Sequence, residues 1–492
     1  MRKTALAVKA ARTYGNIHPP CLVIPCRVAS PQSPTPFRQT SVSIRETWDA
    51  KQVHPAGFPV IDGISKQPST GRRHGMQLKS ILNYVERHKS FVYQEERWIE
   101  EGGRRAIEVP IEPRANSRPI CSGCGRTGPG YDRLPTRRFT YVPLWGIAVY
   151  YVYAMRRVDC PRCGVTVEAV PWAEGKCHMT MSYQWFLARW AGRISWQGVA
   201  DAFCTTWENV FHAVKMAVSW GLTRRDLSDV ESIGVDEVQW KKGHKYLTLV
   251  YQIDAEHKRL LWIGGERKAK TLLRFFRFFG KENTKRLRYV CSDMWKPYLK
   301  VIAKKAAHAV HVLDRFHIMC HLNKAIDAIR AAESKRLVRD GYEPVLKHSR
   351  CCLLKRPKNM TEKQTVKLSE VMQYNLRTVR AYLHREEFQR FWEYRSPSWA
   401  GRFLGEWCRR VMRSRLEPMK KVVRLLRRHE RLILNWFEAE GTISAAVVEG
   451  LNNNVKLTMR KAYGFRTQEA IEIALYHQLA DLPQPEFTHK FC

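Results

Sequence analysis

The order of apolar runs between residues 230 and 314 constrains the fold of this chain more than any other feature. Three strand-like runs come in close succession, and two more follow, each after a helix-like segment. The strand-like runs are SIGVDEV, YLTLVYQID, RLLWIGGE, RYVCSD and AVHVLD, and the helix-like segments are KTLLRFFRFF and KPYLKVIAKKA. Short runs rich in β-branched and aromatic residues favour strands. Three adjacent strands followed by alternating helices and strands predict a mixed sheet with helices packed on it.

Aspartates end several of these apolar runs, where a carboxylate is hard to solvate. Asp236, followed by Glu237, lies near the end of the first run, and Asp293 and Asp314 end the fourth and the fifth. A single strand-end aspartate is more often a solvated turn residue or a helix cap, but two on neighbouring strands favour a shared site. Side chains alternate between faces along a strand, so Glu237 is expected to point away from that site. Carboxylates suit Mg²⁺, and two such ions can catalyse displacement at phosphorus.

A third acid is expected beyond a long helical block, in the segment ISAAVVEGLNNNVKLTMRKAYGFR. If this segment is one helix, Val447, Leu451, Val455 and Met459 form an apolar stripe. The opposite, polar face then carries Glu449, Asn453, Lys456 and Arg460. Asparagines are poor helix formers, so polar contacts are expected for the run Asn452, Asn453 and Asn454. The alternative for Glu449 is an ordinary surface acid near a helix N-terminus.

Four cysteines form two CxxC pairs, each in a turn that contains glycine. The pairs are Cys121 with Cys124, in CSGCG, and Cys160 with Cys163, in CPRCG. Four thiolates complete a tetrahedral shell around Zn²⁺ and leave no open position, so the pattern predicts one structural zinc ion. The gap between the pairs is longer than usual, and a strand-rich aromatic run, YVPLWGIAVYYVYAMRRV, fills it. The alternative is that these are unrelated buried cysteines.

Three short helices are expected over residues 181–225, and they have the length of a helix-turn-helix. Ser195 can cap the second helix, and Thr205 with Glu208 forms a capping-box pattern before the third. The third helix is a possible recognition helix, with Lys215 as a candidate DNA contact. Any small three-helix unit would have the same pattern, so the two interpretations are evenly balanced.

The charge of the chain favours a polyanionic partner. Lys and Arg number 84 against 46 Asp and Glu, which gives a net charge of +38. Such an excess is typical of nucleic-acid binding. Residues 402–431 alone contain eleven basic and three acidic residues, among them the candidate DNA contacts Arg409, Arg410, Lys420 and Lys421. A solvated helix face is the alternative interpretation of this run.

Residues 1–75 hold 9 of the 24 prolines and only three acids, without a sustained period. This composition predicts a disordered extension, and we expect Met76 to be the natural start. No apolar run approaches the roughly 18 residues that a membrane span needs, and no secretory signal is visible. We therefore expect no membrane partner and a reducing compartment, the cytoplasm.

Four motifs resemble those of the ISL3 family of bacterial insertion-sequence transposases, namely GVDEVQW, SDMWKPY, LDRFHIM and EGLNNNVKLTMRKAYGF. The resemblance extends from about Met76 to the low 480s. It implies an RNase H-like core with Asp236, Asp293 and Glu449 as ligands of two Mg²⁺ or Mn²⁺ ions. Asp314 is an auxiliary candidate, either as a ligand or as a residue that orients one, and His317 beside it would contact phosphate or pack. On the helix of Glu449, the residues Asn453, Lys456 and Arg460 become candidate DNA contacts.

The expected fold class is therefore multidomain α+β, in five parts. These are an extension (1–75), a region with a zinc ribbon (76–180), a helix-turn-helix (181–225), a core (230–317 and 441–482) and a basic helical insertion (318–440). The expected activity is cutting of double-stranded DNA at terminal inverted repeats and joining to target DNA, by a homo-oligomer in the bacterial nucleoid. One rival is a nuclease of the same fold without strand transfer. The other is a zinc-ribbon DNA-binding regulator whose acids are structural.

Overall fold

The computed structural model describes residues 77–439, 445–462 and 464–486. The expectations of a disordered extension and of a start at Met76 lie outside the described residues. Within the described part there are two mixed β-sheets and many helices. No helix of that part is long and apolar enough to cross a membrane.

The first sheet follows helix α1 (Leu78–Val85) and has six strands in the order β1-β3-β5-β4, with β2 beside β3 and β6 beside β5. The strands are β1 (Phe91–Tyr93), β2 (Arg97–Glu101), β3 (Arg104–Pro113), β4 (Gly130–Leu144), β5 (Ile147–Cys160) and β6 (Gly164–Val167). Their apolar side chains pack around Trp172, which is fully buried.

The chain reverses direction within the aromatic run 141–158, which the sequence predicts to be rich in strand. Trp145 and Gly146 connect β4 to β5 with φ angles of 49° and 80°. Positive φ at both central residues is what a two-residue hairpin turn of type I′ requires. The cysteine pairs are therefore separated by a hairpin of two long strands.

Three helices follow the first sheet, α2 (Met181–Arg193), α3 (Trp196–Ala202) and α4 (Trp207–Arg224). The Ser195 hydroxyl accepts a hydrogen bond from the backbone N–H of Gly198, as the sequence predicts. The expected capping box at Thr205 is wrong by one residue. Thr206 is the N-cap of α4, and the Thr205 hydroxyl accepts instead from the side chain of Asn209.

The second sheet contains all five strand-like runs of the sequence analysis. Its order is β11-β10-β7-β8-β9, where β7, β8 and β9 are antiparallel neighbours and β10 and β11 run parallel to β7. The strands are β7 (Ser232–Lys241), β8 (Lys245–Ile253), β9 (Lys258–Gly265), β10 (Tyr289–Ser292) and β11 (Val310–Leu313). The prediction of a mixed sheet with packed helices is confirmed.

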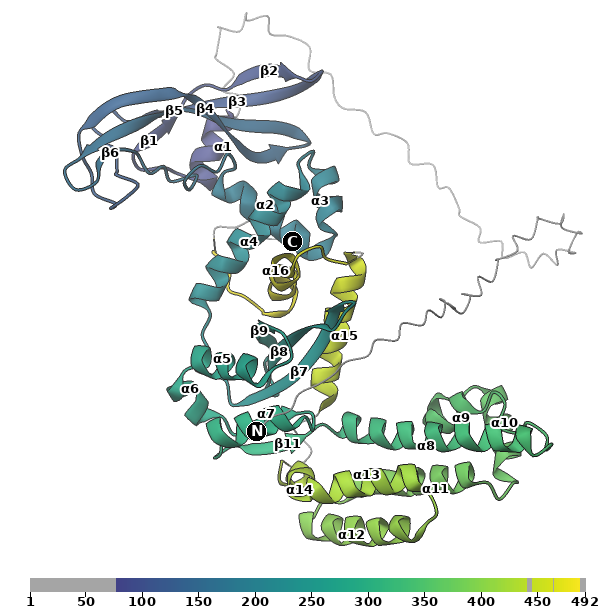
Figure 1. Cartoon of the computed structure of the whole chain (residues 1–492). Coiled ribbons are helices and arrows are strands. Elements are labelled where there is room, and N and C mark those ends of the chain that lie inside the picture. Colours follow the sequence, from purple (N-terminus) through teal and green to yellow (C-terminus); the bar gives the residue numbers. More distant parts are fainter. Residues whose placement is uncertain (1–76, 440–444, 463, 487–492) are drawn as a thin grey trace, which may run out of the picture. The chain divides into compact units, whose positions relative to one another are not determined.

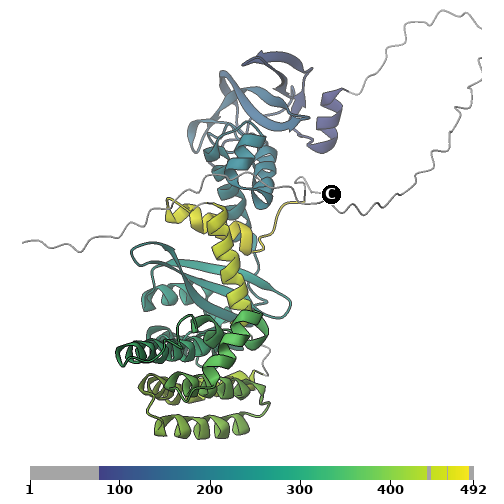
Figure 2. The same ribbon diagram turned by 90° about the vertical axis from the view of Figure 1, so that its right-hand side faces the viewer.

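Helices cover both faces of this sheet. Side chains of α5 (Ala269–Phe279) and α7 (Lys296–Lys305) pack on one face, with the short α6 (Lys281–Arg286) between them in the chain. Side chains of α15 (Ala445–Lys461) and α16 (Gln468–Leu479) pack on the other. Figures 1 and 2 show α15, in yellow, lying along the strands, although it is separated from them by more than 130 residues of chain. Helix α16 also packs against α4.

From Arg315 to Glu438 the chain is mainly helical and has its own hydrophobic core around Phe388, Phe391 and Trp407. The elements are α8 (Arg315–Arg339), α9 (Arg350–Leu354), η1 (Pro357–Asn359), α10 (Glu362–Met372), α11 (Arg377–Gln389), η2 (Arg390–Glu393), α12 (Pro397–Arg413), α13 (Glu417–Arg428) and α14 (Glu430–Glu438). Helix α14 packs against β11, and Asn435 in it donates a hydrogen bond to the carbonyl of His311 in β11. This core is thereby joined to the edge strand of the second sheet.

Candidate functional site

Three aspartates lie at the same level of three neighbouring parallel strands, Asp236 within β7 and the other two, Asp293 and Asp314, directly after β10 and β11. Ser292 in β10 is paired with Val235 in β7 and with Leu313 in β11. The residues that follow these three in the chain are Asp293, Asp236 and Asp314. Because paired residues of parallel strands share a level and a face, the three aspartates form a row at the carboxyl edge of β10 and β11.

Asp236 lies on the face of the sheet that α15 covers, and its carboxylate is bonded on both oxygens. Oδ1 accepts the backbone N–H of Glu237 at 2.8 Å, and Oδ2 accepts the side-chain amide of Asn452 at 2.5 Å. The Asn452 carbonyl oxygen in turn accepts the hydroxyl of Tyr251 at 2.7 Å. Burial raises the pKa of Asp236, and the charges of Asp314 and Asp293 add to this, while the Glu237 N–H and His317 oppose it.

Glu449 lies on α15 one turn before Asn452 and is half-buried. Residues three apart on a helix are neighbours on its surface, so Glu449 is on the side of α15 whose Asn452 contacts Asp236. Helix α15 also contacts α8. There the pKa of Cys320 is raised by burial and by the charges of Asp314 and Glu449. Both observations place Glu449 beside the row of aspartates.

Asp293 is held from two sides. Its Oδ1 accepts the backbone N–H of Trp295 at 3.0 Å, and its Oδ2 pairs with the Arg267 guanidinium at 3.0 Å. The same guanidinium pairs with Glu237 at 3.0 Å and lies over the ring of Trp295, 4.7 Å from its centroid. Glu237 does point to the opposite face from Asp236, but through Arg267 it remains part of the site. Burial and the nearby Asp293 raise the pKa of Glu237 to about 7, against the opposing charge of Arg267.

Asp314 is the N-cap of α8, and its Oδ1 accepts the backbone N–H of Phe316 at 2.7 Å. Its Oδ2 is 2.6 Å from Nδ1 of His317. This hydrogen bond, and then the charges of Asp314, Asp236 and Asp293, raise the pKa of His317 to about 9 although burial opposes the shift. His317 is therefore a cation at neutral pH, close to all three aspartates.

The four carboxylates do not converge to the spacing of a metal shell. Among the residues that the structure describes, only the four-cysteine cluster brings three or more His, Cys, Asp or Glu donors within 4.8 Å of one another. Asp236, Asp293 and Asp314 each have a different partner, namely Asn452, Arg267 and His317. The donor set is nevertheless chemically suited to Mg²⁺, because it offers only carboxylate oxygens.

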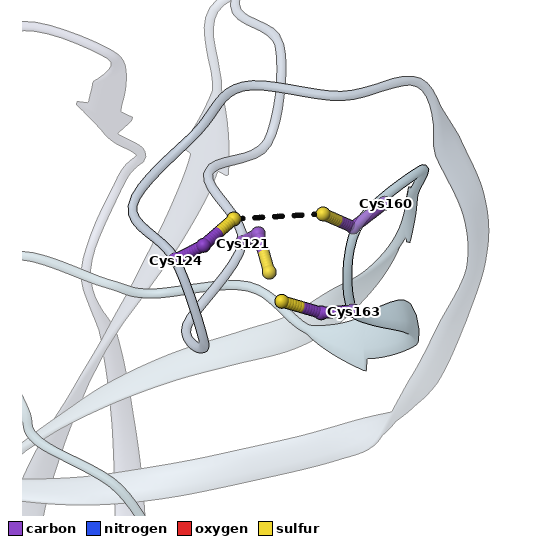
Figure 3. Close-up of side chains that lie close together, drawn as sticks. All are labelled: Cys121, Cys124, Cys160 and Cys163. Atoms are coloured by element: carbon purple, nitrogen blue, oxygen red, sulfur yellow. Dashed lines mark hydrogen bonds between the residues drawn. The ribbon is translucent and has the colours of Figure 1, made fainter.

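Figure 3 shows the cysteines Cys121, Cys124, Cys160 and Cys163 with their sulfur atoms turned toward one another. The sulfurs of Cys124 and Cys160 are 3.5 Å apart, which is close to the spacing of two thiolates on one Zn²⁺ with bonds of about 2.3 Å. The hydroxyl of Thr166 lies 3.2 Å from the Cys121 sulfur, and this hydrogen bond is the main cause that lowers the pKa of the Cys121 thiol to about 6. The cluster could therefore hold one zinc ion in a closed shell.

The candidate DNA contacts differ in what they touch. Lys215 pairs with Glu469 of α16 at 2.5 Å, Arg410 pairs with Glu387, and Lys420 is 4.0 Å from Glu417. Five candidates are exposed, namely Arg409, Lys421, Asn453, Lys456 and Arg460. The four basic ones among them form no ion pair with the residues that the structure describes. The structure therefore leaves Arg409 and Lys421 in the insertion, and the exposed face of α15, as surfaces that phosphate could reach.

The roles of two residues of the site were not recognised from the sequence: polar contacts were expected for Asn452, but without Asp236 as the partner, and Arg267 was not considered. Asn452 is 6% exposed, and with Val448, Leu451 and Val455 it forms an i, i+3, i+4, i+7 pattern. An asparagine within an apolar stripe is a signal that could have identified it. Arg267 lies two residues after the end of β9, and nothing in its sequence context distinguishes it from other basic residues after a strand.

Comparisons with known proteins agree on one family. A family model described as a transposase of the DDE, ISL3 type matches residues 233–475. The transposase for insertion sequence element IS1001 of Bordetella parapertussis is 28% identical over 375 residues, 76% of this chain and 91% of that protein. The transposase for insertion sequence element IS1557 of Mycobacterium tuberculosis is 28% identical over 395 residues, 75% of this chain and 87% of that protein. The matched residues include the row of aspartates and Glu449, and the chain therefore belongs to the ISL3 family of DDE transposases, enzymes that process nucleic acid.

Proposed function

We propose that this transposase cuts DNA at the ends of its insertion sequence and joins the freed ends to target DNA. Asp236, Asp293 and Glu449 would hold two Mg²⁺ or Mn²⁺ ions, and the second sheet with α15 and α16 would form an RNase H-like core. The observation that carries the proposal is the row of aspartates at one level on three parallel strands, under the helix that bears Glu449.

Bound divalent ions would supply the charge that stabilises the attacking and leaving oxygens at phosphorus. In the cutting step a water oxygen forms a bond to phosphorus and the bridging 3′ oxygen leaves, which produces a free 3′-hydroxyl. In the joining step that hydroxyl forms the new bond to a target phosphorus, and the target's own 3′ oxygen leaves. The two steps have the same in-line geometry, so one site can serve both.

The chain's own residues prepare this site. Asn452 fixes the orientation of the Asp236 carboxylate, and Asp293 is fixed by Trp295 and Arg267. Asp314 would act either as a further ligand or as a residue that orients one; one of its oxygens caps α8 and the other contacts His317. His317, whose hydrogen bond to Asp314 raises the pKa of its imidazole to about 9, would balance the charge of a scissile phosphate.

The rest of the chain suits DNA binding. A zinc ion in the four-cysteine cluster would stabilise a ribbon, and α2 to α4 would act as a helix-turn-helix. Helix α4, the possible recognition helix, packs on α2, α3 and α16. The exposed basic residues Arg409 and Lys421, with Asn453, Lys456 and Arg460, would contact the DNA backbone.

The test uses Asp236→Asn, Asp293→Asn and Glu449→Gln, each of which keeps the side-chain shape and removes one charge. Each should abolish cutting and joining of oligonucleotides that carry the flanking terminal repeats, while binding to those repeats persists. Glu438→Gln, at an exposed acid of α14, is the matched control and should leave both steps intact. Cutting without joining would indicate the nuclease. Full activity of Asp236→Asn would refute the catalytic assignment of Asp236, and a parent chain that binds the repeats but does not cut them would favour the DNA-binding regulator.

A further inference from the structure

Arg267 connects two acids that belong to different strands. It pairs with Glu237 in β7 and with Asp293 after β10, at 3.0 Å in each case. Trp295 supports the guanidinium from one side by its ring, 4.7 Å away, and also donates its backbone N–H to Asp293. Tyr298 adds to the same cluster, since its hydrogen bond to Glu237 lowers the pKa of that carboxyl. The guanidinium is therefore fixed in place and not a free surface charge.

The exposed fractions of Glu237, Asp293 and Arg267 show that the two carboxylates depend on the guanidinium as a partner. The Glu237 side chain is 7% exposed and that of Asp293 is 12% exposed, against 36% for Arg267. A buried carboxylate without a partner is strongly unfavourable, and the planar guanidinium can bond two carboxylates at once. Each oxygen of Asp293 accepts one hydrogen bond and retains a free lone pair. A divalent cation could therefore bind Asp293 while Arg267 and Trp295 keep it oriented, as ligand carboxylates commonly are by the groups behind them.

An arginine beside a cation site has a disadvantage, because its positive charge repels the cation that the carboxylate is meant to bind. Glu237 removes this disadvantage, since the pair of Glu237 and Arg267 is neutral as a whole. The acid next to Asp236 then has a reason to be buried on the opposite face of the strand. It cancels the charge of the residue that orients Asp293.

We propose that Glu237 and Arg267 form a neutral pair that orients Asp293 for divalent-cation binding, so that both are positioning residues. This rests on the proposed function, in which Asp293 is a metal ligand. It differs from the expectation that Glu237 takes no part in the site.

The test is titration of the full chain with Mn²⁺, followed by electron paramagnetic resonance at about pH 8, well above the ordinary pKa of a carboxyl group. Glu237→Gln leaves the charge of Arg267 uncancelled and should weaken Mn²⁺ binding on the order of 10-fold or more. The double variant Glu237→Gln with Arg267→Gln removes both charges and should recover much of that loss. Glu266→Gln is the matched control, because Glu266 is an exposed neighbouring acid whose ion pair among the described residues is with Lys268, and this variant should bind Mn²⁺ as the parent does.

Equal Mn²⁺ affinity of Glu237→Gln and Glu266→Gln would overturn the inference, and so would a double variant that binds no better than Glu237→Gln. If Glu237→Gln does not fold, Arg267→Lys replaces it. Lysine keeps the charge but loses the fork geometry, and unchanged Mn²⁺ affinity would again overturn the inference. Asp293→Asn separates the two proposals. Should it bind Mn²⁺ as the parent does, the proposed function is wrong at this residue.

Discussion

Replacing Asn452 by alanine tests whether its buried amide joins α15 to the sheet. The substitution removes the bond from Asn452 to the Asp236 carboxylate and the bond from Tyr251 to Asn452. A bond to a charged group contributes about 2 kcal/mol and a neutral one about 1 kcal/mol. Because the partners are buried and would lose these bonds without access to water, we expect the free energy of opening of α15 to fall by about 3 kcal/mol.

The assay is native-state hydrogen exchange of α15, which measures a local opening free energy and does not require the whole chain to unfold in one step. Asn453→Ala is the matched control, because Asn453 is the exposed neighbour on the same helix. The gain in helix propensity from asparagine to alanine is the same at both positions and cancels in the comparison. A loss at Asn452 no larger than that at Asn453 would refute the inferred coupling between α15 and Asp236.

Three further predictions concern the zinc site, the basic surface and pH. Replacing Cys121 by serine should remove stoichiometric zinc, measured by elemental analysis, and zinc retained at one ion per chain would contradict a four-thiolate shell. Charge reversal of Arg409 and Lys421 should reduce the slope of log affinity for duplex DNA against log salt by about 0.9 per contact, whereas an unchanged slope would assign them to a solvated face. Since the pKa of His317 rises from 6.5 to about 9 on folding, its stabilising effect is complete below the lower value and is lost as pH rises through the upper one. The melting temperature should fall over that window, and His317→Gln should flatten the fall, measured by circular dichroism; a parallel pH profile in the variant would disprove the linkage.

The second sheet was predictable because its strands are short, apolar and separated by clear helix patterns. Strands β7 to β11 begin and end within a few residues of the ends of the five apolar runs that predict them. The first sheet was less accessible. Its hairpin turn at Trp145 and Gly146 lies between two aromatic strands without the asparagine or aspartate that usually marks such a turn.

For the acids, too, local sequence patterns predicted some features and missed others. The period of α15 indicated its polar face, but a stripe drawn through Val447 and Leu451 left out Asn452, which the packing buries beside Val448. Alternation correctly separated Glu237 from Asp236, but it could not show that Arg267 reaches Glu237 and Asp293 together. Contacts between residues distant in sequence depend on the tertiary arrangement, which local periodicity does not contain.

The separation of α15 from its sheet in the chain has a consequence for biosynthesis. Strand β8 is complete at Ile253, but the residues of α15 that cover its apolar face, such as Val455, are made about 200 positions later. At a ribosomal rate of about 5–20 residues per second, Leu249 and Tyr251 on that face wait roughly 10–40 seconds for their partners. The helical insertion has its own core and can fold during this interval. During this interval the nascent sheet exposes an apolar face and is prone to aggregation. A delay of the ribosome within the insertion should therefore increase the fraction of chains that aggregate or bind chaperones before α15, with Glu449, packs on the sheet.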